Sequence, residues 1–226
     1  MVGGRQAKDA LFDGLASVAR ALGNGRRAEI VDVLVQGERR VDELAGEIGQ
    51  SVANTSQHLQ VLLRAGLVTT RRAGTRVYYA LAGPAVAELW TAVRGVAEGY
   101  VAEIDELATA YLGDRSGLET ISREQLAERL RSGDVVVLDV RPVPEFAAGH
   151  VPGAINVPPG ELDRRLDELP DGQPVVAYCR GPYCVYADEA VRGLAARGRP
   201  AMRLIDGLPE WAAAGLPVAV GAARSA

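Results

Sequence analysis

The most telling stretch of this chain reads Pro174-Val175-Val176-Ala177-Tyr178-Cys179-Arg180-Gly181-Pro182-Tyr183-Cys184. The apolar run before Cys179 predicts a buried strand, and the Ala-rich pattern from Tyr183 to Ala196 predicts a helix. The loop between them holds both cysteines of the chain. Backbone N–H groups and the dipole at the start of a helix favour an anion. Because the thiolate is the nucleophilic form of cysteine, the stretch predicts a reactive Cys179.

The same alternation of strand and helix extends to both sides of this stretch. Further strands are expected at Val135 to Leu138 and Met202 to Ile205, and further helices at Ser122 to Leu130, Glu161 to Leu169 and Leu208 to Ala213. Ser122 and Gln125 have the spacing of a capping box. The second half is therefore predicted to be an α/β domain with a parallel sheet and helices on both faces.

The first half has a different, mainly helical pattern. Helices are predicted at Leu11 to Leu22, Ala28 to Val35, Val41 to Ile48 and Val52 to Ala65, the last with Ser51 as N-cap. An alternating stretch from Thr69 to Leu81, turning at Ala73-Gly74, predicts a β-hairpin. Two helices joined by a tight turn and followed by a hairpin form a winged helix-turn-helix.

The second of these helices and the hairpin supply candidate contacts to DNA. Short polar side chains on the helix can reach base edges in the major groove, and the hairpin arginines can meet phosphates. The chain carries a net charge of −4, yet it has no acidic residue between Glu47 and Glu88. The predicted DNA-binding residues are Asn54, Thr55, Ser56, Gln57, His58, Gln60, Arg64, Arg71, Arg72, Thr75 and Arg76. The apolar side of the helix, with Val52, Leu59, Leu62 and Leu63, is expected to face the core.

A four-three spacing of apolar residues predicts one long helix over residues 84–112, beginning near Pro84. Such a stripe indicates dimerisation, although packing on the core of the same domain is the alternative. The predicted dimerisation residues are Leu11, Leu15, Val86, Trp90, Val93, Ala97, Tyr100, Ile104 and Leu107. The glycine-bounded segment 113–117 reads as a linker, so the expected domains are 1–112 and 118–226.

Composition narrows the class of protein. No stretch reaches the roughly 18 apolar residues of a membrane span, and the N-terminus from Met1 to Arg5 leads into no apolar segment of a secretion signal. Two cysteines are too few for a secreted disulfide scaffold. We therefore expect a cytoplasmic protein with free thiols, without a cofactor or a bound metal and without a membrane partner.

The segment from Ser51 to Val68, Ser-Val-Ala-Asn-Thr-Ser-Gln-His-Leu-Gln-Val-Leu-Leu-Arg-Ala-Gly-Leu-Val, resembles the recognition helix of the ArsR family of bacterial repressors, and Arg72 to Tyr79 resembles its wing. The resemblance covers about residues 8–112. It implies a homodimeric repressor bound to double-stranded operator DNA with an inverted repeat. Metal-sensing members carry cysteines in the helix before the recognition helix. Because Val41 to Glu47 has no cysteine or histidine, direct metal sensing is not expected.

The motifs Leu138-Asp139-Val140-Arg141 and Gly149-His150-Val151-Pro152-Gly153, together with Gly207-Leu208-Pro209-Glu210-Trp211, resemble the rhodanese (sulfurtransferase) fold over about residues 118–219. This resemblance implies that Cys179 is the nucleophile and accepts a sulfane sulfur as a persulfide. Arg180 is the only cation of the loop, and Gly181, Pro182 and Tyr183 complete the predicted anion-binding cradle. His150 belongs to a structural turn of that fold.

Two features of the loop separate the remaining alternatives. Phosphatase-like and arsenate-reductase-like relatives need an arginine six residues after the cysteine, where this chain has Val185. Cys184 stands where many sulfurtransferases have a cation or hydroxyl. It can act as a thiol that resolves oxidised or persulfidated Cys179, or it can be a small buried residue.

These expectations combine into a DNA-binding repressor that senses a small sulfane-sulfur donor or persulfide through Cys179, with Cys184 as resolving thiol. The residues do not set whether modification releases or recruits DNA. The alternative is an enzyme tethered to or regulated by a DNA-binding domain. A sulfurtransferase or a thiol-redox enzyme is expected before an arsenate reductase. A third alternative is a rhodanese domain that is inactive and serves only for packing.

Overall fold

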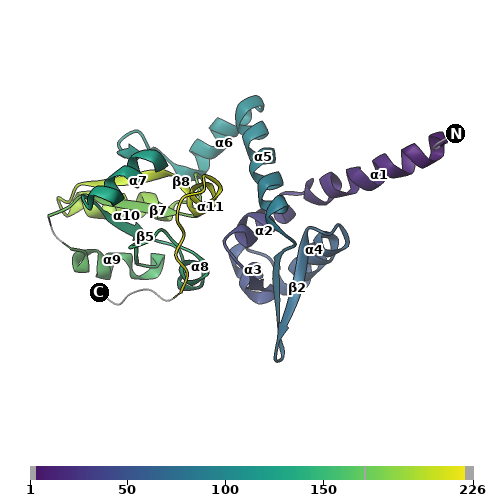
Figure 1. Ribbon diagram of the computed structural model, residues 1–226, viewed down its shortest axis with the longest axis horizontal. Coiled ribbons are helices and arrows are strands. Elements are labelled where there is room, and N and C mark those ends of the chain that lie inside the picture. Colours follow the sequence, from purple (N-terminus) through teal and green to yellow (C-terminus); the bar gives the residue numbers. More distant parts are fainter. Residues whose placement is uncertain (1–3, 171, 222–226) are drawn as a thin grey trace. The chain divides into compact units, whose positions relative to one another are not determined.

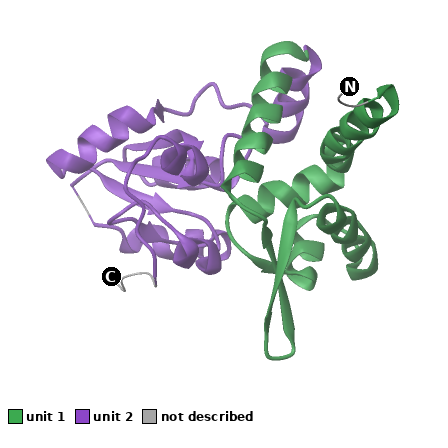
Figure 2. Ribbon diagram, turned by 45° about the vertical axis from the view of Figure 1, so that its right-hand side comes forward, with its two compact units in different colours: residues 1–101 green, residues 102–226 purple. Residues whose placement is uncertain are grey.

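The computed structural model describes residues 4–170 and 172–221, and Figure 1 gives its elements. The chain forms two compact units, Met1–Val101 and Ala102–Ala226 (Figure 2). Both belong to the expected classes: a winged helix-turn-helix is followed by an α/β unit with a parallel sheet. The boundary between the units falls within the helix expected at 84–112, and the domain limits 1–112 and 118–226 remain predictions. Residues 1–3, where no secretion signal is expected, lie outside the described residues.

The first unit is built from helices and one small antiparallel sheet with strand order β1-β3-β2. Arg72 pairs with Val77, and Gly74 turns the hairpin with a φ of 61°. Strand β1 has only two residues, too few for a recognisable alternation. In chain order the elements are α1 Arg5–Leu22, α2 Gly25–Val35, β1 Arg39–Arg40, α3 Val41–Glu47, α4 Val52–Arg64, β2 Val68–Ala73, β3 Arg76–Leu81 and α5 Pro84–Tyr100.

Local signals set the start of α4, the predicted recognition helix. The Ser51 hydroxyl accepts a hydrogen bond from the backbone N–H of Asn54 at 3.2 Å, which confirms the predicted N-cap. Leu59 and Leu62 are fully buried, and Leu63 packs partly against the same core. Val52, expected to face the core, is 49% exposed, because it is the first residue of the helix and lies outside that cluster.

The predicted single helix over 84–112 is wrong, because the chain leaves the helical conformation at Val101. Helix α5 ends at Tyr100, Val101 is extended with φ −104° and ψ 103°, and α6 runs from Glu103 to Leu112. Gly95 and Gly99 weaken the last turns of α5, since glycine disfavours a helix interior. Acidic residues in the first turn of α6 favour a new helix start through the helix dipole.

The second unit contains a five-stranded parallel sheet with strand order β4-β8-β7-β5-β6 and helices on both faces. Alternate strand residues supply two cores: one packs against α9 and α10, the other against α7, α8 and α11. After α6 the elements are β4 Thr120–Ile121, α7 Arg123–Ser132, β5 Val136–Asp139, α8 Val143–Ala148, β6 Ile155–Asn156, η1 Pro159–Glu161, α9 Leu162–Arg165, η2 Leu166–Glu168, β7 Val175–Cys179, α10 Tyr186–Ala196, β8 Ala201–Gly207 and α11 Leu208–Ala213.

Two sequence predictions for this unit differ in outcome. The capping box is confirmed: Ser122 Oγ accepts from the Gln125 N–H at 3.3 Å, and Gln125 Oε1 accepts from the Ser122 N–H at 3.0 Å. Helix α10 begins at Tyr186 and not at Tyr183, because Tyr183 and Cys184 belong to the loop that precedes it. Among the described residues, no helix combines the length and the apolar character needed to cross a membrane.

Candidate functional site

Both cysteines lie at the ends of the loop that follows β7, the central strand of the sheet. They are joined by a disulfide, so the expected free thiols are not found. Cys179 is the last residue of β7 and is only 2% exposed, whereas Cys184 is partly buried against the core that contains Cys179. Their Cα atoms are 6.2 Å apart, within the range that a disulfide can span. The predicted nucleophile and its predicted resolving thiol are therefore brought together, while their chemical roles remain predictions.

The end of strand β8 fixes the path of this loop. Cys179 pairs with Gly207, and a side chain at Gly207 would place its Cβ 2.3 Å from the carbonyl carbon of Arg180 and 2.4 Å from the nitrogen of Gly181. Only a glycine lets the loop backbone approach this closely. In the sequence, Gly207 stands out only as the first residue of a rhodanese-like motif. Its pairing with Cys179 depends on the arrangement of the strands and has no local signal.

Arg180 does not stand free beside the cysteines. Its guanidinium donates to the carboxylate of Glu145 on α8, with Nη2 2.6 Å from Oε1 and Nε 3.0 Å from the same oxygen. The Glu145 side chain is fully buried, and that of Arg180 is 15% exposed. The charge of the predicted loop cation is thus largely balanced by a carboxylate.

A second buried ion pair lies beside Tyr178, the residue before Cys179. Arg141 donates to Asp139 from Nε at 3.0 Å and from Nη2 at 2.6 Å, and neither side chain is exposed. The Tyr178 hydroxyl donates to Asp139 and accepts from the backbone N–H of Val151 at 3.0 Å. Burial, followed by the charge of Asp139, raises the pKa of Tyr178 well above its ordinary value. These groups hold the strand that carries Cys179.

His150 occupies a structural position in the described unit. Its Nδ1 lies 2.9 Å from the carbonyl oxygen of Phe146, its ring stacks on the Phe146 ring at 3.7 Å, and its backbone pairs with Ala219.

The carbonyl oxygens of the cysteine loop are held by two arginines that the sequence did not suggest. Arg115, in the predicted linker, donates to Pro182 O at 2.7 Å and to Cys184 O at 3.1 Å. Arg203 of β8 donates to Pro182 O at 2.8 Å. Both lie beside Asp188, a buried carboxylate of α10. No local signal marks these residues, since their partners are distant in the chain.

The predicted DNA-binding residues of α4 differ in their exposure. Asn54, Gln57, Gln60 and Arg64 are exposed, and Ser56 and His58 are half-buried. Thr55 is fully buried, and its hydroxyl donates to the Ser51 carbonyl at 3.0 Å. Thr55 therefore supports the start of the helix and is corrected from a base-contacting to a structural residue.

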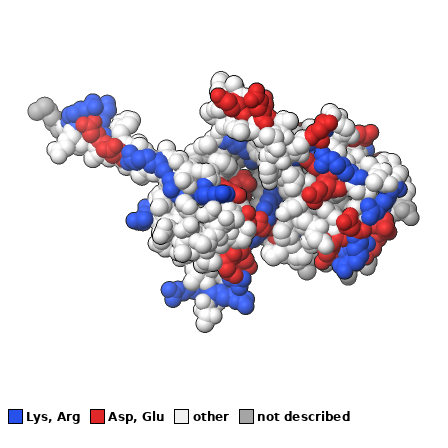
Figure 3. All heavy atoms as spheres, turned by 180° about the vertical axis from the view of Figure 1, so that it is seen from behind, with Lys and Arg blue, Asp and Glu red and all other residues white. Residues whose placement is uncertain are grey.

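The hairpin places its predicted phosphate contacts on the surface. Arg71, Arg72, Thr75 and Arg76 are exposed, and Figure 3 shows Lys and Arg atoms gathered along the hairpin. Arg71 has a carboxylate partner within the unit. It donates to Glu38 through Nε at 3.0 Å and through Nη2, and its guanidinium lies over the Tyr78 ring, 4.9 Å from the ring centre. The hydrogen bond from Arg71 lowers the pKa of Glu38.

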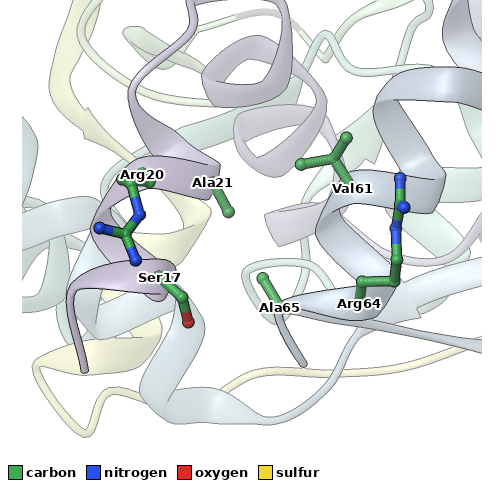
Figure 4. A pocket seen from close by; sticks show the side chains of 6 residues that line it. All are labelled: Ser17, Arg20, Ala21, Val61, Arg64 and Ala65. Atoms are coloured by element: carbon green, nitrogen blue, oxygen red, sulfur yellow. The ribbon is translucent and has the colours of Figure 1, made fainter. Parts of the chain in front are cut away.

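A hollow of about 240 Å³ lies between α1 and α4 in the first unit (Figure 4). Ser17, Arg20 and Ala21 line one side, and Val61, Arg64 and Ala65 line the other. Arg64 donates from Nε to the Gln60 carbonyl along its own helix. The side chains at this hollow are mostly small, and the two arginines lie on opposite walls.

The predicted dimerisation residues also divide into two groups. Leu11, Leu15, Val93, Tyr100 and Leu107 are exposed, with exposed fractions from 41% to 87%, and Ala97 and Ile104 are half-buried. Val86 and Trp90 instead pack on the core of their own unit, where Trp90 Nε1 donates to Asp32 at 2.7 Å. The free apolar stripe of α5 therefore begins after Trp90.

Acidic residues of α3 are engaged in ion pairs. Arg40 contacts Asp42 at 2.7 Å and Glu43 at 3.4 Å. Within residues 4–170 and 172–221, no group of three or more His, Cys, Asp or Glu side chains is placed to hold a metal ion.

Comparisons with known proteins agree with this two-part architecture. Residues 24–70 match the family "Bacterial regulatory protein, arsR family", and residues 122–214 match the family "Rhodanese-like domain". The HTH-type transcriptional regulator Rv0324 of Mycobacterium tuberculosis is 47% identical over 222 residues, which cover 98% of this chain and 97% of that protein. A sulfurtransferase of Allochromatium vinosum is 34% identical over 99 residues, 43% of this chain and 92% of that protein.

Among solved structures, the solution structure of a homodimeric winged helix-turn-helix DNA-binding domain from Mycobacterium bovis (fragment 1–100) is 45% identical. It covers 46% of this chain and 95% of that chain, with a TM-score of 0.42.

Proposed function

The chain belongs to the ArsR-type HTH transcriptional regulators that carry a C-terminal rhodanese-like domain, and from this membership we propose that it is a homodimeric repressor that senses reactive sulfur. The sensing group is Cys179, and Cys184 is its resolving thiol. The observation that carries the proposal is the Cys179–Cys184 disulfide in the loop after β7. The only two cysteines of the chain can therefore exist either as two thiols or as one disulfide, and a regulator can respond to the change between these two states.

The chemistry needs one sulfane-sulfur donor and no metal. The Cys179 thiolate attacks the outer sulfur of an organic persulfide, R–S–SH; the S–S bond of the donor breaks, R–S⁻ leaves, and Cys179–S–SH forms. The Cys184 thiolate then attacks the inner sulfur, Cys179 Sγ, which gives the disulfide and releases HS⁻. The two cysteines lose two electrons in total, and the transferred sulfur is reduced to sulfide. Thiols of the reducing pool return the disulfide to two thiols.

The surroundings of the loop favour sensing over repeated turnover. Arg180 is paired with Glu145, so its charge is shared between the loop and that carboxylate. Cys184 lies within bonding distance of Cys179, so an internal thiol competes with any external sulfur acceptor. Formation of the disulfide ends the cycle until a reductant acts, which suits a switch better than a catalyst.

The proposed homodimer is supported by apolar side chains that the described chain leaves uncovered. Leu11, Phe12 and Leu15 on α1 are each about 60% exposed, and Tyr100 at the end of α5 is 87% exposed. Burial of such side chains against a second copy is favourable by roughly 25 cal/mol for each Å² of apolar surface. Two copies would present two recognition helices to the two half-sites of an operator. We place this activity in the cytoplasm, where thiols are kept reduced.

The direct test is the affinity for a fragment of the protein's own promoter, measured with reduced protein and with protein treated with an organic persulfide. We expect a loss of affinity of at least tenfold on treatment, restored by a thiol reductant. Cys179→Ser should remove the response and keep the affinity of the reduced form. Equal affinity in both states of the wild type, or a full response of Cys179→Ser, would contradict the proposal.

A second candidate is a sulfurtransferase joined to the DNA-binding domain. It is favoured by the likeness of the second half to the sulfurtransferase of Allochromatium vinosum. It predicts many turnovers of a small donor in the presence of an acceptor thiol. Cys184→Ser should then keep or raise the turnover rate, whereas the sensing proposal predicts that this variant accumulates persulfide on Cys179.

A further inference from the structure

We propose that Arg115 is a positioning residue that ties the segment after α6 to the cysteine loop when Cys179 and Cys184 are joined, and releases this segment when the bond opens. The inference rests on the proposed function, because it names how the state of the two sulfurs is passed along the chain. Arg115 lies in the stretch expected to be a plain linker, and its side chain makes three separate contacts.

The first two contacts are hydrogen bonds to carbonyl oxygens of the cysteine loop, so they depend on its conformation. Nη1 of Arg115 donates to the carbonyl oxygen of Pro182 at 2.7 Å, and Nη2 donates to the carbonyl oxygen of Cys184 at 3.1 Å. Cys184 is also the residue whose sulfur bonds to Cys179. The planar guanidinium holds its donors in a fixed fork, so both carbonyls must stay in place for both hydrogen bonds to persist.

The third contact anchors the fork at a buried charge. Nε of Arg115 donates to Asp188 Oδ2 at 2.6 Å, and the Asp188 side chain is only 1% exposed. Arg203 Nε lies 2.9 Å from the other oxygen of Asp188, but the alignment there is not that of a hydrogen bond. Burial and the nearby charge of Arg115 lower the pKa of Arg203. One carboxylate thus holds two arginines that both donate to Pro182.

Neighbouring residues fix the backbone on either side of Arg115. Arg192 of α10 donates to the carbonyl oxygen of Asp114 at 2.8 Å, and the Asp114 side chain accepts from the backbone N–H of Ser116 at 2.8 Å. Helix α6 ends at Leu112, only three residues before Arg115. The segment 113–117 is therefore bound to the cysteine loop and α10, and every change in the loop acts at the end of α6.

Opening the disulfide removes the covalent constraint from one of these acceptors. Cys179 stays at the end of the buried strand β7, because its backbone pairs with β8. Cys184 follows a glycine and a proline in a loop and precedes α10, so its carbonyl is the group that gains freedom. Loss of its fixed position weakens the fork of Arg115. The effect is reciprocal: if the disulfide stabilises the hydrogen bonds of Arg115, these hydrogen bonds stabilise the disulfide by the same free energy.

The test compares hydrogen exchange of the backbone in segment 113–118 between the disulfide form and the dithiol form. Dithiothreitol produces the dithiol form: it is oxidised to its cyclic disulfide, and the two cysteines take up its hydrogens. In the wild-type full-length chain we expect exchange at least tenfold faster in the dithiol form. Arg115→Gln should exchange fast in both forms. Arg199→Gln is the matched control, because Arg199 also donates to two loop carbonyls, those of Leu169 and Pro170, away from the cysteines. It should behave as the wild type.

A second readout separates positioning from mere stabilisation. The thiol–disulfide equilibrium of Cys179 and Cys184 against glutathione should shift about tenfold towards the dithiol in Arg115→Gln and should not shift in Arg199→Gln. Equal exchange of segment 113–118 in both forms of the wild type would overturn the inference, even if Arg115→Gln folds poorly.

Promoter affinity keeps this inference distinct from the proposed function. If persulfide lowers the affinity of the wild type and of Arg115→Gln equally, sensing stands and the role of Arg115 falls. If affinity never responds but exchange and the glutathione equilibrium respond as expected, the role of Arg115 stands and sensing through DNA release falls.

Discussion

The guanidinium of Arg180 and the carboxylate of Glu145 form an ion pair at the cysteine loop, with 2.6 Å between Nη2 and Oε1. The two partners differ in burial, since Glu145 is fully buried and Arg180 is 15% exposed. A charge that can turn towards water loses less than one that is confined to the interior. The stability of the unit should therefore respond unequally to the loss of each partner.

We predict that Arg180→Ala lowers the free energy of unfolding by about 3 kcal/mol, because it takes the guanidinium from a carboxylate that cannot reach solvent. Glu145→Gln should lower it by only about 1 kcal/mol, because the arginine can reorient. Urea denaturation of the reduced protein measures both. A larger loss for Glu145→Gln would contradict this account.

Tyr178 links stability to alkaline pH. Because burial raises its pKa well above the ordinary value, the folded state keeps a proton that the unfolded state releases near pH 10. The folded state then binds more protons, so stability falls as the pH rises above about 10. Urea midpoints between about pH 8 and pH 11 should fall more steeply for the wild type than for Tyr178→Phe.

The same substitution also tests the hydrogen bonds of this hydroxyl. Tyr178→Phe removes the donor to Asp139 and the acceptor for the Val151 N–H, so at pH 8 it should lower the free energy of unfolding by about 1–3 kcal/mol. An unchanged midpoint at pH 8 would show that these hydrogen bonds contribute nothing.

Gly207→Ala should displace the cysteine loop. The added Cβ would meet the Arg180–Gly181 peptide at 2.3–2.4 Å, and a backbone cannot yield as a side chain can. We expect a loss of about 2–3 kcal/mol in stability, in the range of overpacked interiors, and slower disulfide formation. Gly160→Ala is the control, because its Cβ would meet no atom within 4 Å. Thermal denaturation and thiol titration measure the two effects; equal behaviour of the two variants would refute the close approach.

The hairpin should show an asymmetry between two arginines. Arg76→Ala should reduce the slope of log affinity against log salt by about one, as expected for one lost phosphate contact. Arg71→Ala should reduce it by less, because Arg71 must leave Glu38 to meet a phosphate. Fluorescence anisotropy with promoter DNA at several salt concentrations gives the slopes.

Glu38→Gln is the complementary change. The pKa of Glu38 is lowered by its hydrogen bond with Arg71, so Glu38 is ionised at neutral pH and repels phosphate. Removal of this charge should raise the affinity for DNA of any sequence by a few-fold. A lower affinity of Glu38→Gln would mean that Glu38 serves to orient Arg71 for DNA.

Several elements followed from short stretches of sequence because both partners of the decisive contact lie within one turn. Two helix starts are set by hydrogen bonds between residues three positions apart, Ser51 with Asn54 and Ser122 with Gln125. The apolar run before Cys179 is a central strand because a strand buried on both faces needs no polar alternation. The apolar periodicity over 84–112 wrongly predicted one helix, because a single extended residue such as Val101 does not interrupt the spacing of apolar residues.

By itself, the sequence determined the two-part architecture, the helix starts and the loop that carries both cysteines, since these depend on local propensity and hydrophobic period. Only the tertiary structure decided which charges meet. Arg115 and Asp188 are 73 residues apart, Glu145 and Arg180 are 35 apart, and Glu38 and Arg71 are 33 apart. The path of the sheet and the crossing of its helices bring these groups together. No local pattern encodes such pairs, because a charged residue looks the same in the sequence whether it faces water or a buried partner.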